Sequence, residues 1–111
     1  MVNQKNKQKM RKVYLGSGLD YREGYINIDY NKKIKADIYL DLNTQKLPFK
    51  DNTIDYVKCY HVLEHLLQPE KTLQEIQRVL KVNGTAKIIL PHYNLLDHHR
   101  DLTHKVFATS D

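Results

Sequence analysis

Three short apolar runs in the first half of the chain each end on a glycine turn or on a carboxylate, and this order constrains the fold most. Their sequences are Val13-Tyr14-Leu15 before Gly16-Ser17-Gly18, residues 25–29 ending on Asp29, and residues 38–40 before Asp41. Short β-prone runs that stop at turn residues predict strands. Strands with acids at their carboxyl ends predict an open, mostly parallel α/β sheet, in which ligands bind beyond those ends.

The second half of the chain adds two strands and two helices to this prediction. Residues 54–60 form a fourth apolar run, and residues 85–90 form a fifth run that Pro91 ends. Leu73, Ile76, Val79 and Leu80 recur at helical spacing, which predicts a helix over residues 70–81 with Gly84 as a stop just beyond it.

A second helical pattern begins at His61 and ends before Pro69. Four apolar residues share one of its faces, namely Val62, Leu63, Leu66 and Leu67. The segment from His92 onward is polar, and we expect no strand in it. A sheet that ends at the fifth strand has an exposed apolar edge, so we expect self-association, a fragment or completion by a partner.

Composition places these elements in one soluble domain. The 111 residues carry a formal charge of +5, and five lysines and arginines without any acid lie in the first twelve residues. We therefore expect a basic, flexible arm at residues 1–12 and a neutral domain at residues 13–111. Such an arm does not by itself indicate nucleic acid, and no apolar stretch approaches the ~18 residues of a membrane span. The single cysteine, Cys59, excludes an internal disulfide and, with the absence of a signal peptide, suits the cytoplasm.

The predicted carboxyl edge carries groups that suit a nucleoside-bearing cofactor. Residues without side chains, such as Gly16 and Gly18, let backbone amides approach a ligand closely. Asp29, at the end of the next strand, can accept hydrogen bonds from both ribose hydroxyls. Asp41, one strand further, can accept a hydrogen bond from the exocyclic amine of adenine. A glycine turn alone is weak evidence, but the ordered series of turn and two strand-end acids is more specific.

These motifs resemble those of class I S-adenosylmethionine-dependent methyltransferases over residues 13 to about 107. The matching segments are Leu15-Gly16-Ser17-Gly18, residues 24–29, Asp41-Leu42, residues 47–55, residues 61–66 and residues 78–81. The resemblance implies a Rossmann-like sheet with flanking helices and S-adenosyl-L-methionine as cofactor. It also implies that the chain is an enzyme, with an unidentified methyl acceptor.

The resemblance assigns roles to the residues at the strand ends. Leu15, Gly16, Ser17 and Gly18 would line the methionine part of the cofactor, and Asp29 would hold the ribose. Asp41 with Leu42 would read the adenine, while Tyr60 and His61 would face the cofactor. If the acceptor needs a base, the candidates are His61, His92 and Tyr60.

Two departures from the family pattern affect this assignment. In the family an acidic residue often occupies the position of Tyr14, and a third glycine often stands near Asp20. The residues that would bind the methionine end of the cofactor therefore differ most from the family pattern. The family sheet also gains two more strands after the fifth, which this chain lacks on our reading. A non-catalytic or partner-completed domain is therefore the alternative to a complete enzyme.

The histidines after the fourth strand support a rival reading. His61 and His65, with Glu64 between them, match the H-x-x-E-H pattern of a zinc-dependent hydrolase. Some methyltransferases that resemble this segment bind a divalent metal, and here His104 would join His61, Glu64 and His65. We favour the simpler interpretation, in which Glu64 and His65 pack and hydrogen-bond without a metal.

Overall fold

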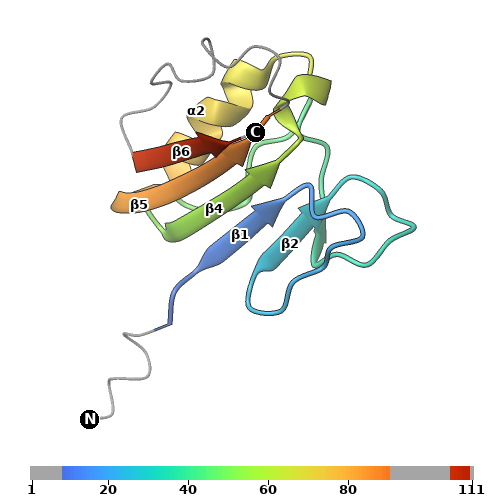
Figure 1. Ribbon diagram of the computed structural model, residues 1–111, viewed down its shortest axis with the longest axis horizontal. Helices are drawn as coiled ribbons and strands as arrows, with labels where there is room; N and C mark the ends of the chain where they lie inside the picture. The colour runs from blue at the N-terminus through green and yellow to red at the C-terminus, as the bar shows by residue number, and fades with distance from the viewer. Residues whose placement is uncertain (1–8, 91–105, 111) are drawn as a thin grey trace.

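A computed structural model describes residues 9–90 and the backbone of residues 106–110, and it contains a six-stranded sheet in which every pairing is parallel. The strand order is β3-β2-β1-β4-β5-β6 (Figure 1). The elements are β1 (Lys12–Leu15), β2 (Ile26–Asp29), β3 (Ile38–Tyr39), β4 (Ile54–Tyr60), η1 (Leu63–His65), α2 (Pro69–Val79), β5 (Leu80–Ile89) and β6 (Val106–Ser110). The predicted α/β class with a parallel, Rossmann-like sheet is confirmed.

The core lies between one face of the sheet and helix α2 (Figure 1). Val13 and Leu15 of β1 pair in register with Val57 and Cys59 of β4, and all four are fully buried. The apolar stripe of α2 joins the same cluster. Because a fully buried aliphatic side chain contributes roughly 1.5–3 kcal/mol, this face supplies much of the stability.

The opposite face of the sheet carries tyrosines around a buried lysine. The Tyr14 ring lies edge-on to Tyr25 and Tyr60, with centroid separations of 6.0 Å in both cases. Lys58 is 7% exposed, and its Nζ lies 4.6 Å from the ring centroids of Tyr14 and Tyr60. The buried ammonium is thus held by aromatic faces, an arrangement that attracts a cation.

The chain switches direction across the sheet between β1 and β4. β2 and β3 lie on one side of β1, and β4, β5 and β6 lie on the other. The connection from β1 to β2 contains turns and no helix, as its short length predicts. Ligands of open parallel sheets bind at such a switch point, beyond the carboxyl ends of the strands.

The predicted helix from His61 is wrong. The segment forms only a single 3₁₀ turn, η1, and His61 itself has a positive φ of 56° that no α-helix contains. The extended backbone at Leu66 then separates η1 from α2. Among the described residues, no helix reaches the length and apolar character of a membrane span.

Helix α2 confirms the predicted helix but ends differently. Pro69 begins the helix at a position where its missing N–H costs nothing, and Val79 ends it. Leu80 passes directly into β5, so Gly84 is not the stop we expected. Gly84 instead lies buried at a shift in register, where residues 81–84 of β5 lie opposite only Asp55 of β4. A Cβ at Gly84 would come within 2.8 Å of Leu80 Cδ2. Close packing explains this glycine.

The expectation that the fifth strand is an exposed edge is wrong. β6 pairs along β5 from Thr85 opposite Val106 to Ile89 opposite Ser110. Self-association through the edge of β5 therefore loses its basis. The sequence of residues 106–110 did not predict this strand, because a five-residue strand within a polar segment depends mainly on pairing with its neighbouring strand.

Candidate functional site

Strand register brings the predicted site residues to one level at the carboxyl edge of the sheet. Leu15 is opposite Ile28 of β2 and Cys59 of β4. The residues that follow these three, namely Gly16, Asp29 and Tyr60, therefore come next on three adjacent strands. The strand register therefore places the glycine turn and the ends of β2 and β4 at the same edge of the sheet.

Gly16 opens the turn in a conformation that a larger residue would strain. Its φ is 71°, and its N–H donates to the carbonyl of Ile28 at 2.8 Å. A Cβ built on Gly16 would overlap Cγ2 of Val62. Both the positive φ and the approach of Val62 therefore require glycine here.

Asp29 is tied to the glycine turn by its side chain. Its Oδ2 accepts a hydrogen bond from the Gly18 N–H at 2.8 Å, and its Oδ1 accepts one from the Asn31 N–H at 2.9 Å. An ionised carboxylate has about four acceptor sites, so these two bonds leave capacity for a ligand's hydroxyl groups. Gly18 has a positive φ of 56°, and a Cβ added there meets nothing within 4 Å, so the space beside it is open.

Ser17 carries an unmatched polar atom at the centre of this turn. The residue is 3% exposed, and its hydroxyl has no hydrogen-bond partner among the described residues. Leaving a buried hydroxyl unpaired costs about 1–3 kcal/mol, so such atoms often have a role. The orphan hydroxyl, the open space at Gly18 and the acceptor capacity of Asp29 together fit a polar ligand with hydroxyl groups.

Asp41 and Leu42 follow β3, one strand beyond Asp29. Asp41 Oδ1 accepts a hydrogen bond from the Asn43 N–H at 2.9 Å, and the Asp41 N–H donates to Gln45 Oε1 at 2.9 Å. Leu42 packs against the core cluster. The loop after β3 is thus held in a defined turn that presents a carboxylate.

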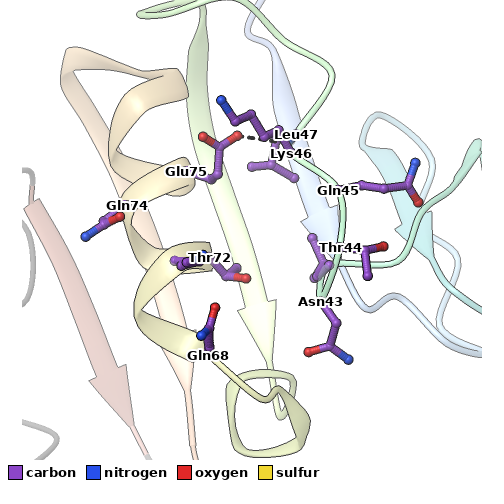
Figure 2. A pocket seen from close by; sticks show the side chains of 11 residues that line it. Asn43, Thr44, Gln45, Lys46, Leu47, Gln68, Thr72, Gln74 and Glu75 are labelled. Atoms are coloured by element: carbon purple, nitrogen blue, oxygen red, sulfur yellow. Dashed lines mark hydrogen bonds between the residues drawn. The ribbon is translucent and has the colours of Figure 1, made fainter.

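A pocket of about 410 Å³ adjoins this loop, and Figure 2 shows it between residues 43–47 and helix α2. Its wall includes Leu42 and polar side chains such as Gln68, Thr72 and Glu75. Glu75 Oε1 accepts a hydrogen bond from the Leu47 N–H at 2.9 Å and so joins the two walls (Figure 2). The described residues that line the pocket include Leu42 but neither the glycine turn nor Asp29, so the pocket meets the candidate site only at Leu42.

His61 follows β4 on the same edge as Tyr60. Its N–H donates to the carbonyl of Ile89 at 2.8 Å, while its side chain is 58% exposed. The backbone of His61 is therefore fixed between β4 and β5, and the imidazole projects outward. A positive φ at a residue other than glycine is uncommon and frequently accompanies functional positions.

The histidines do not form the helical zinc pair that their spacing suggested. Glu64 Oε2 lies 3.7 Å from both His61 Nδ1 and His65 Nε2, but no α-helix places the two imidazoles on one face. Within residues 9–90, no cluster of three or more potential ligands could hold a metal ion. His104 and the candidate base His92 lie outside the described residues, so the fourth ligand and the second base stay predictions.

Sequence reasoning missed a polar network beside the glycine turn. The buried Tyr14 hydroxyl donates to Asp20 Oδ2 at 2.8 Å, and Asp20 also contacts Arg22. Burial, reinforced by the bond to Asp20, raises the pKa of Tyr14 to about 12. The sequence signal for this network was the alternation of side chains along β1, which places Tyr14 on the sheet face away from α2, opposite Lys58 of β4.

A family model described as a methyltransferase domain matches residues 7–88. An uncharacterized protein of Methanocaldococcus jannaschii is 39% identical over 74 residues, covering 64% of this chain and 32% of that protein. The demethylmenaquinone methyltransferase of Listeria monocytogenes is 33% identical over 77 residues, covering 66% of this chain and 32% of that protein. The chain thus spans about a third of the length of these relatives.

A solved structure shares the fold at low sequence identity. It is a chain from the complex between the Haloferax volcanii Trm112 methyltransferase activator and a methyltransferase. The TM-score is 0.59 at 21% identity, and the alignment covers 90% of this chain and 56% of that one.

Proposed function

This chain belongs to the methyltransferase domain family, and we propose that it binds S-adenosyl-L-methionine at the carboxyl edge of its sheet and transfers the methyl group to an acceptor. The observation that carries the proposal is the hydrogen bond from the Gly18 N–H to Asp29 Oδ2 at 2.8 Å. It joins the open glycine turn to a carboxylate with free acceptor capacity, which suits the ribose of a nucleoside cofactor.

The cofactor supplies an activated methyl group on its sulfonium, so the protein's main task is alignment. In the proposed arrangement, Gly16, Ser17 and Gly18 line the amino-acid part, and the Ser17 hydroxyl gains the partner that it lacks. Asp29 accepts from the ribose hydroxyls. Asp41 accepts from the adenine amine, and Leu42 offers an apolar surface beside the ring.

A base is needed only when the acceptor is a hydroxyl or an unactivated amine. We propose His61 for this role, with Tyr60 beside it, because Tyr60 ends β4 and His61 follows it at the switch point of the sheet. The fixed backbone of His61 and its exposed imidazole support the role. His92, after the fifth strand, is the second candidate.

An alternative is a domain that binds the cofactor but transfers methyl groups only with a partner chain. The structural neighbour favours this alternative, since it comes from a complex with a methyltransferase activator. Cofactor binding together with methyl transfer by the isolated chain supports the enzyme. Binding without transfer supports the partner-dependent domain.

Calorimetric titration with S-adenosylhomocysteine tests the proposed site. The wild-type chain should bind, and Asp29→Ala should abolish measurable binding, because each lost charge-assisted hydrogen bond is worth about 1.5–3 kcal/mol. Glu70→Ala, at an exposed acid in the first turn of α2, is the matched control and should bind as the wild type does. Unchanged affinity in a folded Asp29→Ala variant would remove the main support for this site.

A further inference from the structure

The pocket between residues 43–47 and helix α2 lies outside the proposed cofactor site except at Leu42. Its volume of about 410 Å³ falls within the range of roughly 300–1,000 Å³ that is common for small-molecule sites. Gly16, Ser17, Gly18 and Asp29, the main residues of the cofactor proposal, do not line it. The pocket is therefore large enough, and separate enough, to hold a ligand of its own.

Hydrogen bonds hold the two walls of the pocket together at both ends. At one end, Glu75 Oε1 accepts from the Leu47 N–H at 2.9 Å (Figure 2). At the other end, Asn43 Oδ1 accepts from the N–H of Leu67, just before α2, at 2.9 Å. Because these bonds fix the loop against the helix, the pocket is formed before a ligand binds. A preformed site reduces the entropy that binding must otherwise overcome.

The charged groups around the pocket leave an excess of positive charge. Glu75 is the only acid among the described lining residues, and both of its carboxylate oxygens accept hydrogen bonds from Arg78 at 2.9 Å. The lining also contains Lys46 on the loop and Lys71 on the helix. Neither lysine forms an ion pair with a described residue. Each wall thus contributes one ammonium group whose charge is not neutralised by a partner.

Thr72 adds a hydroxyl group to the helix wall. The residue is 3% exposed, and Figure 2 shows it on the side of α2 that faces the loop. No hydrogen bond joins its hydroxyl to another described residue, so this group is free to contact a ligand in the pocket. Gln68 lines the pocket just before α2, and its side chain does not cap the helix. Ammonium, hydroxyl and amide groups can all donate hydrogen bonds to the oxygens of an anion.

We propose that this pocket binds a small phosphate ester. Lys46 and Lys71 approach the phosphate from opposite walls, and the Thr72 hydroxyl donates to one of its oxygens. The two positive charges match the charge of about −1.5 to −2 that a phosphate monoester carries near neutral pH. Leu42 and Leu47 supply apolar surface for the rest of the ligand. This binding activity is additional to the proposed methyl transfer and does not depend on it.

A titration of the full chain with glycerol phosphate, followed by backbone amide NMR shifts, locates the ligand. Saturable shifts should centre on residues 43–47 and on Lys71 and Thr72. Glycerol, and sodium chloride at matched ionic strength, should produce no saturable shifts there, because neither supplies a phosphate group. Shifts centred on Gly16–Gly18 would place the ligand at the cofactor edge and overturn the proposal. Shifts that do not saturate, or equal shifts with glycerol, would also overturn it.

Matched lysine variants test the electrostatic contacts. Lys46→Gln and Lys71→Gln should each weaken glycerol phosphate by about tenfold, because each removes one of the two charges that contact the phosphate. Lys50→Gln, at an exposed lysine of the same loop outside the pocket, is the control and should stay within about twofold of the wild type. All three variants remove the same charge. Equal weakening in all three would mean that only the net charge of the chain attracts the anion, which contradicts a defined site.

Two variants of Thr72 test the hydroxyl contact. Thr72→Val keeps the size of the side chain and removes the hydroxyl, so it should weaken glycerol phosphate severalfold. Thr72→Ser keeps the hydroxyl and should bind within about twofold of the wild type. Thermal melts establish that each variant is folded. Wild-type affinity in a folded Thr72→Val variant, or in folded Lys46→Gln and Lys71→Gln variants, would refute the proposed contacts. These outcomes leave the proposed function untouched, since S-adenosylhomocysteine titration tests that function separately.

Discussion

Asp29 Oδ2 accepts a hydrogen bond from the backbone N–H of Gly18 at 2.8 Å, which joins the end of β2 to the turn after β1. The turn is thereby fixed between two parallel strands rather than left as a free loop. Any ligand at this edge meets a carboxylate and backbone amides whose relative positions are already set. Preorganisation of this kind reduces the entropy that binding must otherwise overcome.

Gly16→Ala should destabilise the fold more than Gly18→Ala. A left-handed conformation costs an alanine about 1–2 kcal/mol at either position. Only Gly16 also faces Val62, so overpacking adds about 1–3 kcal/mol there. Urea denaturation of both variants measures the difference. Val62→Ala in the Gly16→Ala background should recover the overpacking part, and equal losses in the two glycine variants would contradict the contact.

Arg78→Met should lower the free energy of unfolding by about 2–3 kcal/mol, because Arg78 joins α2 to the loop between β3 and β4. Its guanidinium donates to the Leu47 and Phe49 carbonyls at 3.0 and 2.9 Å and also contacts Glu75 and Asp51. Asp51→Asn, at a carboxylate that is 69% exposed, is the control and should cost less than about 1 kcal/mol. Denaturant titration checks both, and similar small losses would show that the loop holds without Arg78.

Tyr14 should make the fold sensitive to alkaline pH. Burial and the bond to Asp20 raise its pKa from 10.0 to about 12, so the folded state favours the protonated phenol. The corresponding stability is complete below pH 10 and is lost as pH rises toward 12. Unfolding free energies across this window should therefore fall less steeply in Tyr14→Phe than in the wild type. The control, Tyr30→Phe at a 71% exposed ring, should keep the wild-type slope. An unchanged slope in Tyr14→Phe would argue against the buried phenol.

A chelator should leave the melting temperature unchanged. Glu64 lies 3.7 Å from the nearest nitrogens of His61 and His65, and no described cluster of three or more ligand residues contains them. Thermal melts with EDTA, and with EDTA already saturated with calcium as control, measure the effect. A drop of several degrees with free EDTA alone would instead assign a metal to these residues and His104.

The sequence by itself determined the parallel sheet and the order of its site residues. Apolar runs such as residues 54–60, the turn at Gly16 and Gly18, and the helix stripe of α2 are local signals, and each produced its element within a few residues. Asp29 and Asp41 were identified because an acid at a strand end reaches the ligand edge of any parallel sheet. These features depend on residues that are close together in the sequence, so the sequence pattern alone predicts them.

Only the tertiary structure decided which distant residues meet. The contact of Tyr14 with Asp20 depends on how the turn folds back over β1, and the pairing of β6 with β5 depends on an edge that another part of the chain supplies. The helix predicted at His61 gave way to η1 because the backbone of His61 is held by Ile89 of β5 in a conformation that no helix allows. Hydrogen bonds between distant residues outweighed local propensity at each of these positions, because propensity differences are small beside the cost of leaving buried polar groups unpaired.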